Sequence, residues 1–482
     1  MHLNEQEIFD RLSKGRPIFT EFPKPAEPMI IGIETELGVD RDVPDNDLNV
    51  TRNAVDDSDF KNFPRWLSSG GYCHEDQKHL EVCTPEVSNP VAAVVYQRAI
   101  LEQVPQLFGQ DNQERSIKWY ANNCDWNENP SELKSFGNHE SYSTSLSWSK
   151  WPVLAPFLAA RTLISGVGYV DDENNFHISQ RARFIKDLQN VDTIQRRALV
   201  CTRGTETAQS KRSQRLHLIC GECNLNQMAL FLKIAFTALV VELAELDELP
   251  DIKFESDGLV KDTQRLSESV STWIVDHSYK SPGAWLMTST HDQISAIDLL
   301  WSYLEKIKQL FRGRDFITDL FIVVMTDTLI QLSHFEKHLD RLARRLDWVA
   351  KLWLCRFAVR ENIPDQVLAS YDLQYHRLGK ESLQRDLEKT RGAEMLVSSQ
   401  LIQFAKWEAP ADTRASFRGW LVKLLENDRA YRSLKLAIFQ NQDPRRWDYC
   451  QVNRGENIHT SFLIDDPFNP YHDLRNTALK KL

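Results

Sequence analysis

The sequence lacks the motifs that identify several large enzyme classes. It contains no GxxxxGK motif followed by Ser or Thr, and no GxGxxG motif after a predicted strand. These absences argue against the phosphate-binding loops of P-loop and dinucleotide-binding folds. A GxSxG motif is also absent, which argues against an α/β-hydrolase nucleophile.

An apolar leader and a long hydrophobic run are missing as well. The N-terminus, MHLNEQEIFDRL, is charged from its start, unlike a signal peptide. The most apolar run, residues 228–243, is too short to span a bilayer and contains Lys233. We therefore expect a soluble, cytoplasmic protein.

Cysteine is sparse. Eight Cys are scattered over 482 residues, which is not the dense pattern of a disulfide framework. The one close pair, Cys220 and Cys223, has the spacing of half a zinc site, but no Cys or His pair at ligand spacing follows it. The thiols are expected to be reduced and partly buried.

Apolar and acidic residues, by contrast, are plentiful. A hydrophobic content of 42%, with 13 Trp and 23 Phe, is enough for a sizeable core and excludes wholesale disorder. The net charge of −10 argues against general nucleic-acid binding, which needs a basic surface that displaces counterions. It does not forbid a local basic groove.

The order of strand and helix patterns predicts an α+β fold, with an antiparallel sheet and helices gathered on one side. Residues 1–28 are predicted to be an appended N-terminal extension, with a short amphipathic segment around Ile8 and Leu12. Strands are predicted at residues 29–39, 70–85 and 116–121, and after Glu140. Helices are predicted at residues 90–108, 152–166, 228–249, 417–425 and almost throughout 292–357. Residues 40–69 are predicted to be a surface loop with a short helix near 60–67.

The most informative residues are acidic and lie on or beside the first two predicted strands. Side chains alternate along a strand, so Glu34 and Glu36 project from the same face. This set contains acidic residues and histidines that could also bind a metal: Glu34, Glu36, Asp76, Glu81, Glu86, Glu140, His74, His79 and His139. Carboxylates on one face repel each other unless a cation binds or some are protonated, and oxygen ligands favour Mg²⁺ or Mn²⁺. The alternative is a solvated sheet edge.

A basic stretch lies between residues 181 and 215. Its cations are Arg181, Arg183, Lys186, Arg196, Arg197, Arg203, Lys211, Arg212 and Arg215. In an acidic protein such a stretch suits phosphates or an acidic partner, and the alternative is a solvated charged face. His217 follows it, as a candidate phosphate or metal contact or as a core histidine.

Short matches to a known family run through nearly everything after residue 28. They are IGIETELGV (31–39), the segment 70–86, NNCD (122–125), FGNHES (136–141), PFLAART (156–162), ISQRA (178–182), TR (202–203), RLHLICGECN (215–224), LDWVAKL (346–352), DLQYH (372–376), DTRASFRG (412–419) and DDPF (465–468). In number, order and spacing they resemble the Pup ligase and depupylase family, which is related in fold to glutamine synthetase and glutamate–cysteine ligase.

The resemblance implies a glutamine synthetase-like catalytic domain at residues 29–405 and a small C-terminal α/β domain at 406–482. It also implies ATP and Mg²⁺ as cofactors. Ligases of this family phosphorylate a glutamate at the end of the small protein tag Pup and pass it to a lysine, and depupylases cleave that isopeptide bond.

The resemblance also assigns residues to the chemistry. Glu34 and Glu81 match Mg²⁺ ligands, and Asp76 matches the proton acceptor of the ligases. A lysine amine is protonated at neutral pH, so the reaction needs such a base. Glu36 joins the metal ligands because phosphoryl transfer needs metal-held phosphates, and Glu140 is a further candidate ligand.

The expected nucleotide contacts are spread along the chain. Thr84 matches one in the family, and Trp447 is the nearest equivalent of another. Arg215 and His217 fall in the region that faces the phosphates. Arg203 falls there too and is a candidate catalytic cation near the transferring oxygens.

Two positions ahead of Asp76 depart from the family. An Arg and a Tyr are usual where this chain has Tyr72 and His74. His74 can replace the Tyr as a metal ligand, whereas Tyr72 can replace the Arg contact with the nucleotide only by stacking. The usual family residues are also changed at Ser141 and within 204–209, whereas His139, Glu140, Thr202 and Arg203 are kept.

Ligase chemistry is favoured over hydrolysis. The long insertion that depupylases carry between the first two strands is absent, and the DDPF ending resembles that of ligases. The predicted function is an ATP-dependent carboxylate–amine ligase that forms an isopeptide bond. It would join the glutamyl carboxylate of a small acidic Pup-like protein, or a similar small acid, to an amine such as lysine. The alternatives are a depupylase-like isopeptidase or deamidase, and a nucleotide-binding regulator that has lost catalysis. No nucleic-acid or membrane partner is expected.

Overall fold

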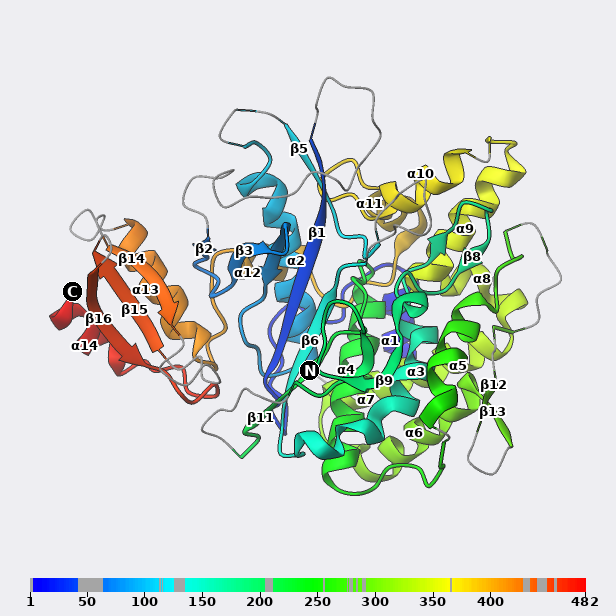
Figure 1. Cartoon of the computed structure of the whole chain (residues 1–482), viewed down its shortest axis with the longest axis horizontal. Helices are drawn as coiled ribbons and strands as arrows, with labels where there is room; N and C mark the ends of the chain where they lie inside the picture. The colour runs from blue at the N-terminus through cyan, green and yellow to red at the C-terminus, as the bar shows by residue number, and fades with distance from the viewer. Residues whose placement is uncertain are drawn as a thin grey trace.

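A seven-stranded sheet stands at the centre of the molecule (Figure 1). The computed structural model describes residues 3–41, 64–111, 114, 116–124, 135–203, 211–254, 256–274, 276, 281–282, 285–287, 292–364, 366–427, 434–439, 449–454 and 457–482. The sheet strands are β1 (Ile31–Arg41), β2 (Arg65–Trp66), β3 (Tyr72–Asp76), β4 (His79–Cys83), β5 (Ile117–Tyr120), β6 (Asn138–Thr144) and β11 (Gln214–Leu218). Their order is β11-β6-β1-β4-β3-β2, with β5 also paired to β1, and every pairing is antiparallel.

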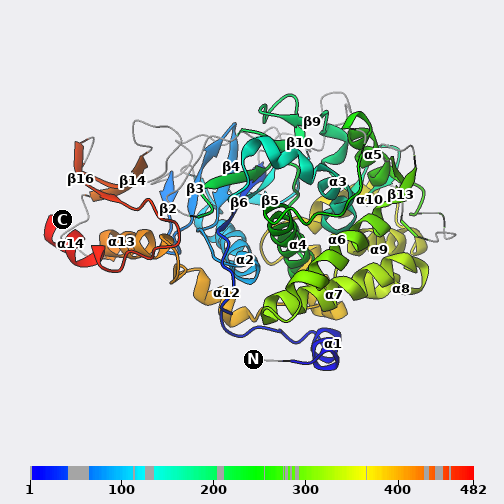
Figure 2. The same cartoon turned by 90° about the horizontal axis from the view of Figure 1, so that it is seen from below.

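Helices cover one face of this sheet. Along β1, Ile31, Ile33 and Leu37 are buried on that face. Helices α2 (Pro90–Leu107) and α4 (Gln227–Glu245) pack against it, as the view from below shows (Figure 2). The opposite face carries the intervening residues of β1. This arrangement confirms the predicted α+β fold with an antiparallel sheet.

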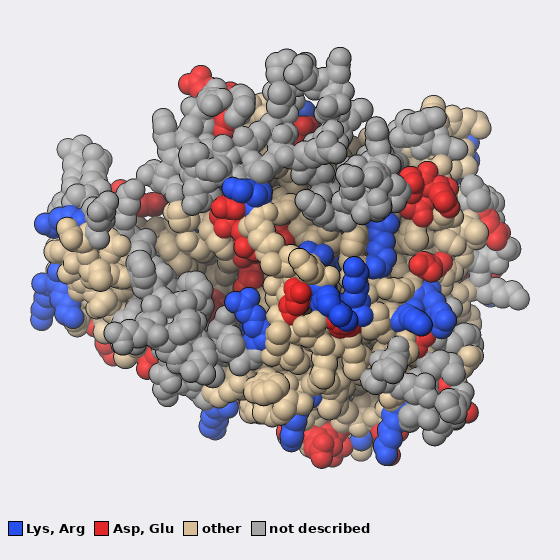
Figure 3. Space-filling view, in the orientation of Figure 1, with Lys and Arg blue, Asp and Glu red and all other residues tan. Residues whose placement is uncertain are grey.

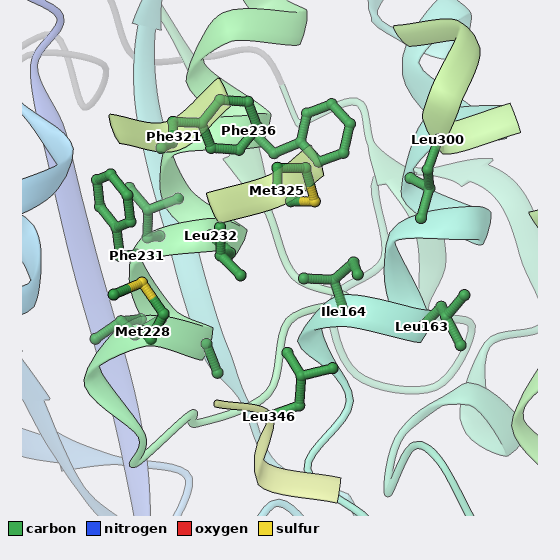
Figure 4. Packing of buried hydrophobic residues seen from close by; sticks show 14 of the residues in the cluster. Leu163, Ile164, Met228, Phe231, Leu232, Phe236, Leu300, Phe321, Met325 and Leu346 are labelled. Atoms are coloured by element: carbon green, nitrogen blue, oxygen red, sulfur yellow. The ribbon is translucent and has the colours of Figure 1, made fainter. Parts of the chain in front are cut away.

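The hydrophobic core lies among the helices beside the sheet. Phe231 and Phe236 of α4 are fully buried and pack with Ile164 of α3 (Ala155–Ser165) and Phe321 of α7 (Phe316–Ser333) (Figure 4). The other helices of this half are α5 (Ser256–Glu268), α6 (Ala296–Phe311), α8 (Phe335–Leu342), α9 (Asp347–Arg360), α10 (Gln366–Tyr375), α11 (Leu383–Leu387) and α12 (Ser399–Ala405), with a π-helical turn at Glu388–Gly392.

Short strands and 3₁₀ turns complete this part of the chain. The strands are β7 (Tyr169–Val170), β8 (Phe176–His177), β9 (Asp187–Asn190), β10 (Ala198–Cys201), β12 (Trp285–Met287) and β13 (Gln293–Ser295), which form two-stranded pairs. The 3₁₀ helices are Trp148–Leu154 and Ala182–Phe184.

Two helices are long and apolar enough to cross a membrane by length and composition. They are α4, whose apolar stretch is 100% buried inside the protein, and α7, whose apolar stretch is 61% buried. Helix α4 has 19 residues, which is long enough to cross a membrane, so the expectation that this segment is too short was wrong. Its complete burial explains the apolar composition, because a core helix is apolar all round.

The N-terminal extension is docked on the body of the protein instead of hanging free. Helix α1 (Glu5–Ser13) begins with a capping box formed by Asn4 and buries Ile8 and Leu12. Beyond the helix, Phe19 forms a parallel bridge with Val397. The predicted amphipathic segment therefore forms a helix, which packs against the helical half of the molecule (Figure 2).

The last part of the chain forms a smaller unit with its own apolar cluster. It comprises α13 (Ala415–Asn427), β14 (Leu434–Phe439), β15 (Tyr449–Arg454), β16 (Asn457–Leu463) and α14 (Leu474–Lys481). Phe417, Leu421 and Phe462 are buried within it. The exact boundary at residue 406 stays a prediction.

Two sequence predictions in the sheet were wrong. The single strand expected at 70–85 is a hairpin, in which β3 and β4 pair across a turn at Gln77 and Lys78. Both turn residues have positive φ, 48° and 75°, without the Gly or Asn that usually announces such a turn. Most of the loop expected at 40–69 lies outside the described residues, and residues 65–66 of the helix expected near 60–67 form strand β2.

A buried ion-pair group joins the C-terminal unit to the central sheet. Glu86, which follows β4, accepts hydrogen bonds from Arg414 Nε at 2.7 Å and from Arg418 Nη1 at 3.0 Å. Burial alone would raise the pKa of Glu86, but the charges of Arg418 and Arg414 hold it below its ordinary value. The contribution of this carboxylate to stability is present above the unfolded pKa and is lost as the pH falls.

Replacing Glu86 with Gln should therefore destabilise the protein by about 3–5 kcal/mol at neutral pH, because it leaves a buried guanidinium without its counter-charge. Glu426→Gln is the matched control. It removes the ion pair with Arg65, which joins the same two units at 3.3 Å, but side chains that are 35% and 48% exposed should cost less than about 1 kcal/mol. Urea unfolding measures both, and equal losses would contradict the assignment.

Candidate functional site

The face of the central sheet opposite α2 and α4 collects most of the polar residues that the sequence singled out. Strand register places Glu34 opposite both His139 of β6 and Cys83 of β4, and Glu36 opposite Glu81. On the next strand, His74 lies opposite Glu81. Residues directly opposite one another project from the same face, so strands far apart in sequence build one polar surface. In the space-filling view, acidic side chains gather in a hollow between the C-terminal unit and the main body (Figure 3).

Four carboxylates on this face form what we term the carboxylate cluster: Glu34, Glu36, Asp76 and Glu81. Glu81 is 6% exposed, and its burial together with the charges of Glu34 and Glu36 raises its pKa well above the ordinary value. Burial and the charge of Glu36 also raise the pKa of Asp76. The metal-free cluster therefore holds more negative charge than its surroundings stabilise, and a bound cation would relieve the repulsion.

The donor atoms of the cluster fit a divalent cation. Glu36, Glu81 and His139 each place one possible ligand atom within 4.8 Å of the others, and Glu34, His139 and His217 do the same. Carboxylate oxygens are the ligands that Mg²⁺ prefers, and imidazole is compatible with Mn²⁺. The predicted metal ligands Glu34, Glu36 and Glu81 thus lie together as expected.

Basic side chains border the cluster on the β11 side. Arg215 forms an ion pair with Glu34 and donates from Nε to Ser141 Oγ at 3.0 Å. The His217 ring lies 3.2 Å from the same hydroxyl through Nδ1. Burial alone would raise the pKa of Glu34, but the charge of Arg215 and the neighbouring His217 and His139 lower it below its ordinary range. Burial and the Arg215 charge lower the pKa of His217 to about 3, so its imidazole is neutral at neutral pH.

A second cation beside the cluster was not among the predicted site residues. Arg181 is 2% exposed, and among the described residues its Nη1 has no hydrogen-bond partner. Burial and the charge of Arg197 lower its pKa to about 10. A buried guanidinium with a spare donor is suited to bind a phosphate or a carboxylate. The sequence placed Arg181 in the basic stretch but could not show that it turns inward.

Gly137 allows Glu36, His139 and Arg181 to lie close together. Its amide donates to Glu36 Oε2 at 2.8 Å and so holds that carboxylate at the edge of the cluster. A Cβ at Gly137 would lie 2.8 Å from Arg181 Nη1 and would also meet the His139 ring. A glycine is therefore needed where the three groups converge.

Three further arginines of the basic stretch contact other parts of the protein and not the carboxylate cluster. Arg196 pairs with Asp187 at 2.6 Å, and Arg212 pairs with Glu245 at 3.0 Å. Arg183 lies over the Tyr169 ring at 4.3 Å. The stretch is therefore not a continuous phosphate-binding surface, and only part of it faces the carboxylates.

The prediction of Glu140 as a metal ligand was wrong. It is fully buried on the helix-covered face of β6, where it pairs with Arg161 at 2.7 Å and accepts a hydrogen bond from Tyr142 at 2.6 Å. Its neighbour His139 faces the carboxylates instead. Successive side chains in a strand point to opposite faces, so an assignment displaced by one residue selects the wrong face.

Three aromatic rings are stacked along the rim of the site, and we term them the aromatic column: Trp66, Tyr72 and His74. The Trp66 and Tyr72 ring centroids are 4.3 Å apart, and those of Tyr72 and His74 are 5.0 Å apart. The guanidinium of Arg418, from the C-terminal unit, lies 5.3 Å from the Trp66 ring. The column thus links the ion pairs of Glu86 to the edge of the carboxylate cluster.

The remaining predicted contacts are not tested by their positions. Thr84 is buried, and its hydroxyl accepts a hydrogen bond from the Ile33 amide at 3.0 Å. Arg203 is exposed after β10, and its charge helps to lower the pKa of His217. Trp447 and the changed residues 204–209 lie outside the described residues. The roles of Thr84, Arg203 and Trp447 with a nucleotide stay predictions.

Known proteins are similar to this chain in sequence and in fold. The family model described as Pup-ligase protein matches residues 33–434, which is most of the chain. The chain belongs to the Pup-ligase family. The depupylase of Acidothermus cellulolyticus is 28% identical over 438 residues, covering 83% of this chain and 80% of its own length. The Pup–protein ligase of Bifidobacterium longum subsp. infantis is 26% identical over 445 residues, covering 86% and 89%.

Solved structures of the Pup-ligase family have the same fold. The complex between prokaryotic ubiquitin-like protein Pup and its ligase PafA matches with a TM-score of 0.74 at 22% identity, over 94% of this chain and 91% of that one. The structure of the Pup ligase PafA in complex with ADP matches with a TM-score of 0.67 at 21% identity, over 88% and 90%.

The two buried carboxylates Glu81 and Glu140 should respond oppositely to neutralisation. Glu81→Gln should raise the free energy of unfolding of the metal-free protein by about 1 kcal/mol at neutral pH, because it relieves repulsion in the cluster. Glu140→Gln should lower it by about 3–5 kcal/mol, because Arg161 loses its partner. Urea unfolding with a chelator present measures both.

The pH dependence supplies the control for this pair. The gain from Glu81→Gln should disappear below a pH of about 4, where the carboxyl is protonated in both the folded and unfolded states. A destabilised Glu81→Gln protein at neutral pH would contradict our description of the cluster.

Proposed function

We propose that this protein is an ATP-dependent Pup–protein ligase. It would join the terminal glutamyl carboxylate of a small, acidic Pup-like protein to the ε-amino group of a lysine on an acceptor protein. The observation that carries the proposal is the carboxylate cluster bordered by Arg215 and Arg181 in a member of the Pup-ligase family. This combination supplies ligands for a cation and donors for phosphate oxygens on one sheet face.

The cluster would hold Mg²⁺, with Glu34, Glu36 and Glu81 as its carboxylate ligands and His139 beside them. Bound there, the cation would neutralise the phosphate oxygens of ATP and offset the repulsion that raises the pKa of Glu81. Arg215 and Arg181 would donate hydrogen bonds to the phosphoryl group or to the substrate carboxylate. Tyr72 is the middle ring of the aromatic column, stacked on both Trp66 and His74, so a nucleotide could stack on it only if one of these two rings moved aside.

The reaction would have two steps. First, a carboxylate oxygen of the Pup glutamate attacks the γ-phosphorus of ATP, which forms an acyl phosphate and releases ADP. Second, the lysine nitrogen attacks the acyl carbon, the C–N bond forms, and inorganic phosphate leaves. The lysine must lose a proton before it attacks, and Asp76 on the same sheet face would accept it.

Cleavage of Pup conjugates is the second candidate function. It is favoured by relatives that bear the name depupylase and that match 83% of this chain at 28–29% identity. The same polar face would then position water in place of a lysine. The short connector between Glu36 and Gly70 favours the ligase.

A pair of reactions separates the two candidates. The protein is incubated with ATP, Mg²⁺, a Pup ending in Glu and a lysine-bearing acceptor, and the acceptor is weighed by mass spectrometry. A ligase adds the mass of Pup minus one water and releases one ADP for each conjugate. A preformed conjugate incubated with the enzyme gives the reverse test. Release of Pup without stoichiometric ADP would establish the depupylase, and no reaction in either arm would favour a nucleotide-binding regulator.

Asp76→Asn should reduce ligation at least about 100-fold, which is the lower end of the usual contribution of a general base. Binding of ATP should be almost unchanged, as measured by equilibrium dialysis. Glu75→Gln is the matched control, because Glu75 is the adjacent acid on β3 and its side chain accepts from the Lys78 amide at 2.7 Å. Ligation that survives Asp76→Asn would remove Asp76 from the role of base.

A further inference from the structure

We propose that His74, Glu81 and Cys83 form a binding site for Zn²⁺ or a similar thiophilic divalent cation. The site shares Glu81 with the carboxylate cluster and goes beyond the proposed function, because it would hold a thiophilic ion and not Mg²⁺. It does not depend on the ligase reaction, because its ligands are side chains of this chain alone.

The three donors come from two paired strands. Glu81 lies directly opposite His74 in the β3–β4 register, and Cys83 lies two residues beyond Glu81 on the same face. The His74 Nε2 atom is 3.6 Å from Glu81 Oε1, and the Cys83 Sγ atom is 3.4 Å from the same oxygen. One donor atom from each of the three residues lies within 4.8 Å of the others.

These separations suit a tetrahedral ion. Zinc bonds of about 2.0–2.3 Å to nitrogen, oxygen and sulfur imply edges of roughly 3.3–3.8 Å between neighbouring ligands. Magnesium bonds of about 2.0–2.1 Å in an octahedron imply edges of roughly 2.8–3.0 Å. The two distances to Glu81 Oε1 fall in the tetrahedral range, so the three side chains would need to move little to bind a zinc ion.

The chemistry of the donors points in the same direction. Thiolate sulfur and imidazole nitrogen select zinc and related ions, whereas magnesium takes oxygen ligands. Cys83 has no role in the proposed ligase chemistry, although its Sγ atom lies beside Glu81 of the carboxylate cluster. On binding, the S–H bond is replaced by an S–metal bond, and the thiol proton passes to solvent.

The surroundings favour a cation at this position. Glu81 is buried beside three other carboxylates, and no Lys or Arg forms an ion pair with it in the described part of the chain. The ring of His74 is already oriented, because it stacks on Tyr72. Three protein ligands leave the fourth tetrahedral position for water or a substrate oxygen, as in catalytic zinc sites.

A harder cation would use different atoms of the same face. The set Glu36, Glu81 and His139 contains no sulfur and is the better match for Mg²⁺. The two sets share Glu81, so the two cations would compete for that carboxylate. Cys83 distinguishes them, because only the site proposed here contains a metal–sulfur bond.

Cobalt substitution tests the site directly. The full chain is stripped with a chelator, kept reduced, and titrated with Co²⁺ in the absence of nucleotide and Pup. We expect one equivalent of Co²⁺ to produce a thiolate-to-cobalt charge-transfer band in the near ultraviolet, and one equivalent of Zn²⁺ to abolish it. One equivalent of Mg²⁺ should leave the band unchanged. A wild-type protein that binds Co²⁺ without the band, or binds none, would overturn the proposal.

Variants assign the ligands. Cys83→Ser, which keeps the size of the side chain and its donor, should remove the band, and His74→Phe, which keeps the ring stack, should weaken Zn²⁺ binding at least about tenfold. Cys73→Ala is the matched control, because Cys73 is a fully buried thiol on the opposite face of β3. A band that survives Cys83→Ser, or that disappears in Cys73→Ala, would overturn the site.

This experiment separates failure of the site from failure of the proposed function. Metal binding is measured without ATP, Pup or an acceptor, so a protein that ligates normally and shows no cobalt–sulfur band disproves only the zinc site. A protein that shows the band and has no ligase or depupylase activity disproves only the proposed function.

Discussion

Repulsion among carboxylates on one face of the central sheet is the constraint on which the rest of the structure depends. Glu34, Glu36, Asp76 and Glu81 are held together by strand pairing and not by mutual attraction, so the fold must supply the free energy that keeps them close. It does so by burying the other face of the same strands against α2 and α4. A stable core therefore carries an unfavourable charge arrangement, which a bound cation would relieve.

Arginine side chains lie at the edge of the carboxylate cluster and do not pair with all of its members. Arg215 satisfies Glu34 from the adjacent strand, whereas Arg181 keeps an unpaired donor at the edge among the described residues. In the function proposed above, both cations would contact an anionic substrate while the carboxylates of Glu36 and Glu81 would bind a metal. An arrangement in which every carboxylate had a guanidinium partner would be more stable and would bind no cation.

The C-terminal unit is physically connected to this site. Arg418 pairs with Glu86 and also lies over Trp66, at the outer end of the aromatic column, and His74 forms the inner end. A movement of α13 would shift the ring stack before it reached the carboxylates. The same contacts that stabilise the boundary between the two units therefore help to orient a metal-ligand candidate of the sheet.

The sequence by itself determined the α+β class, the strand that carries Glu34 and Glu36, and the gathering of acidic residues, because local periodicity and composition encode these features. It did not determine the hairpin at Gln77 and Lys78, whose turn residues carry no usual turn signal. It also selected Glu140 where His139 faces the cluster. Only the tertiary structure decided which face of β6 meets the carboxylates and which arginines turn inward, because strand register and burial arise from contacts between segments far apart in the chain.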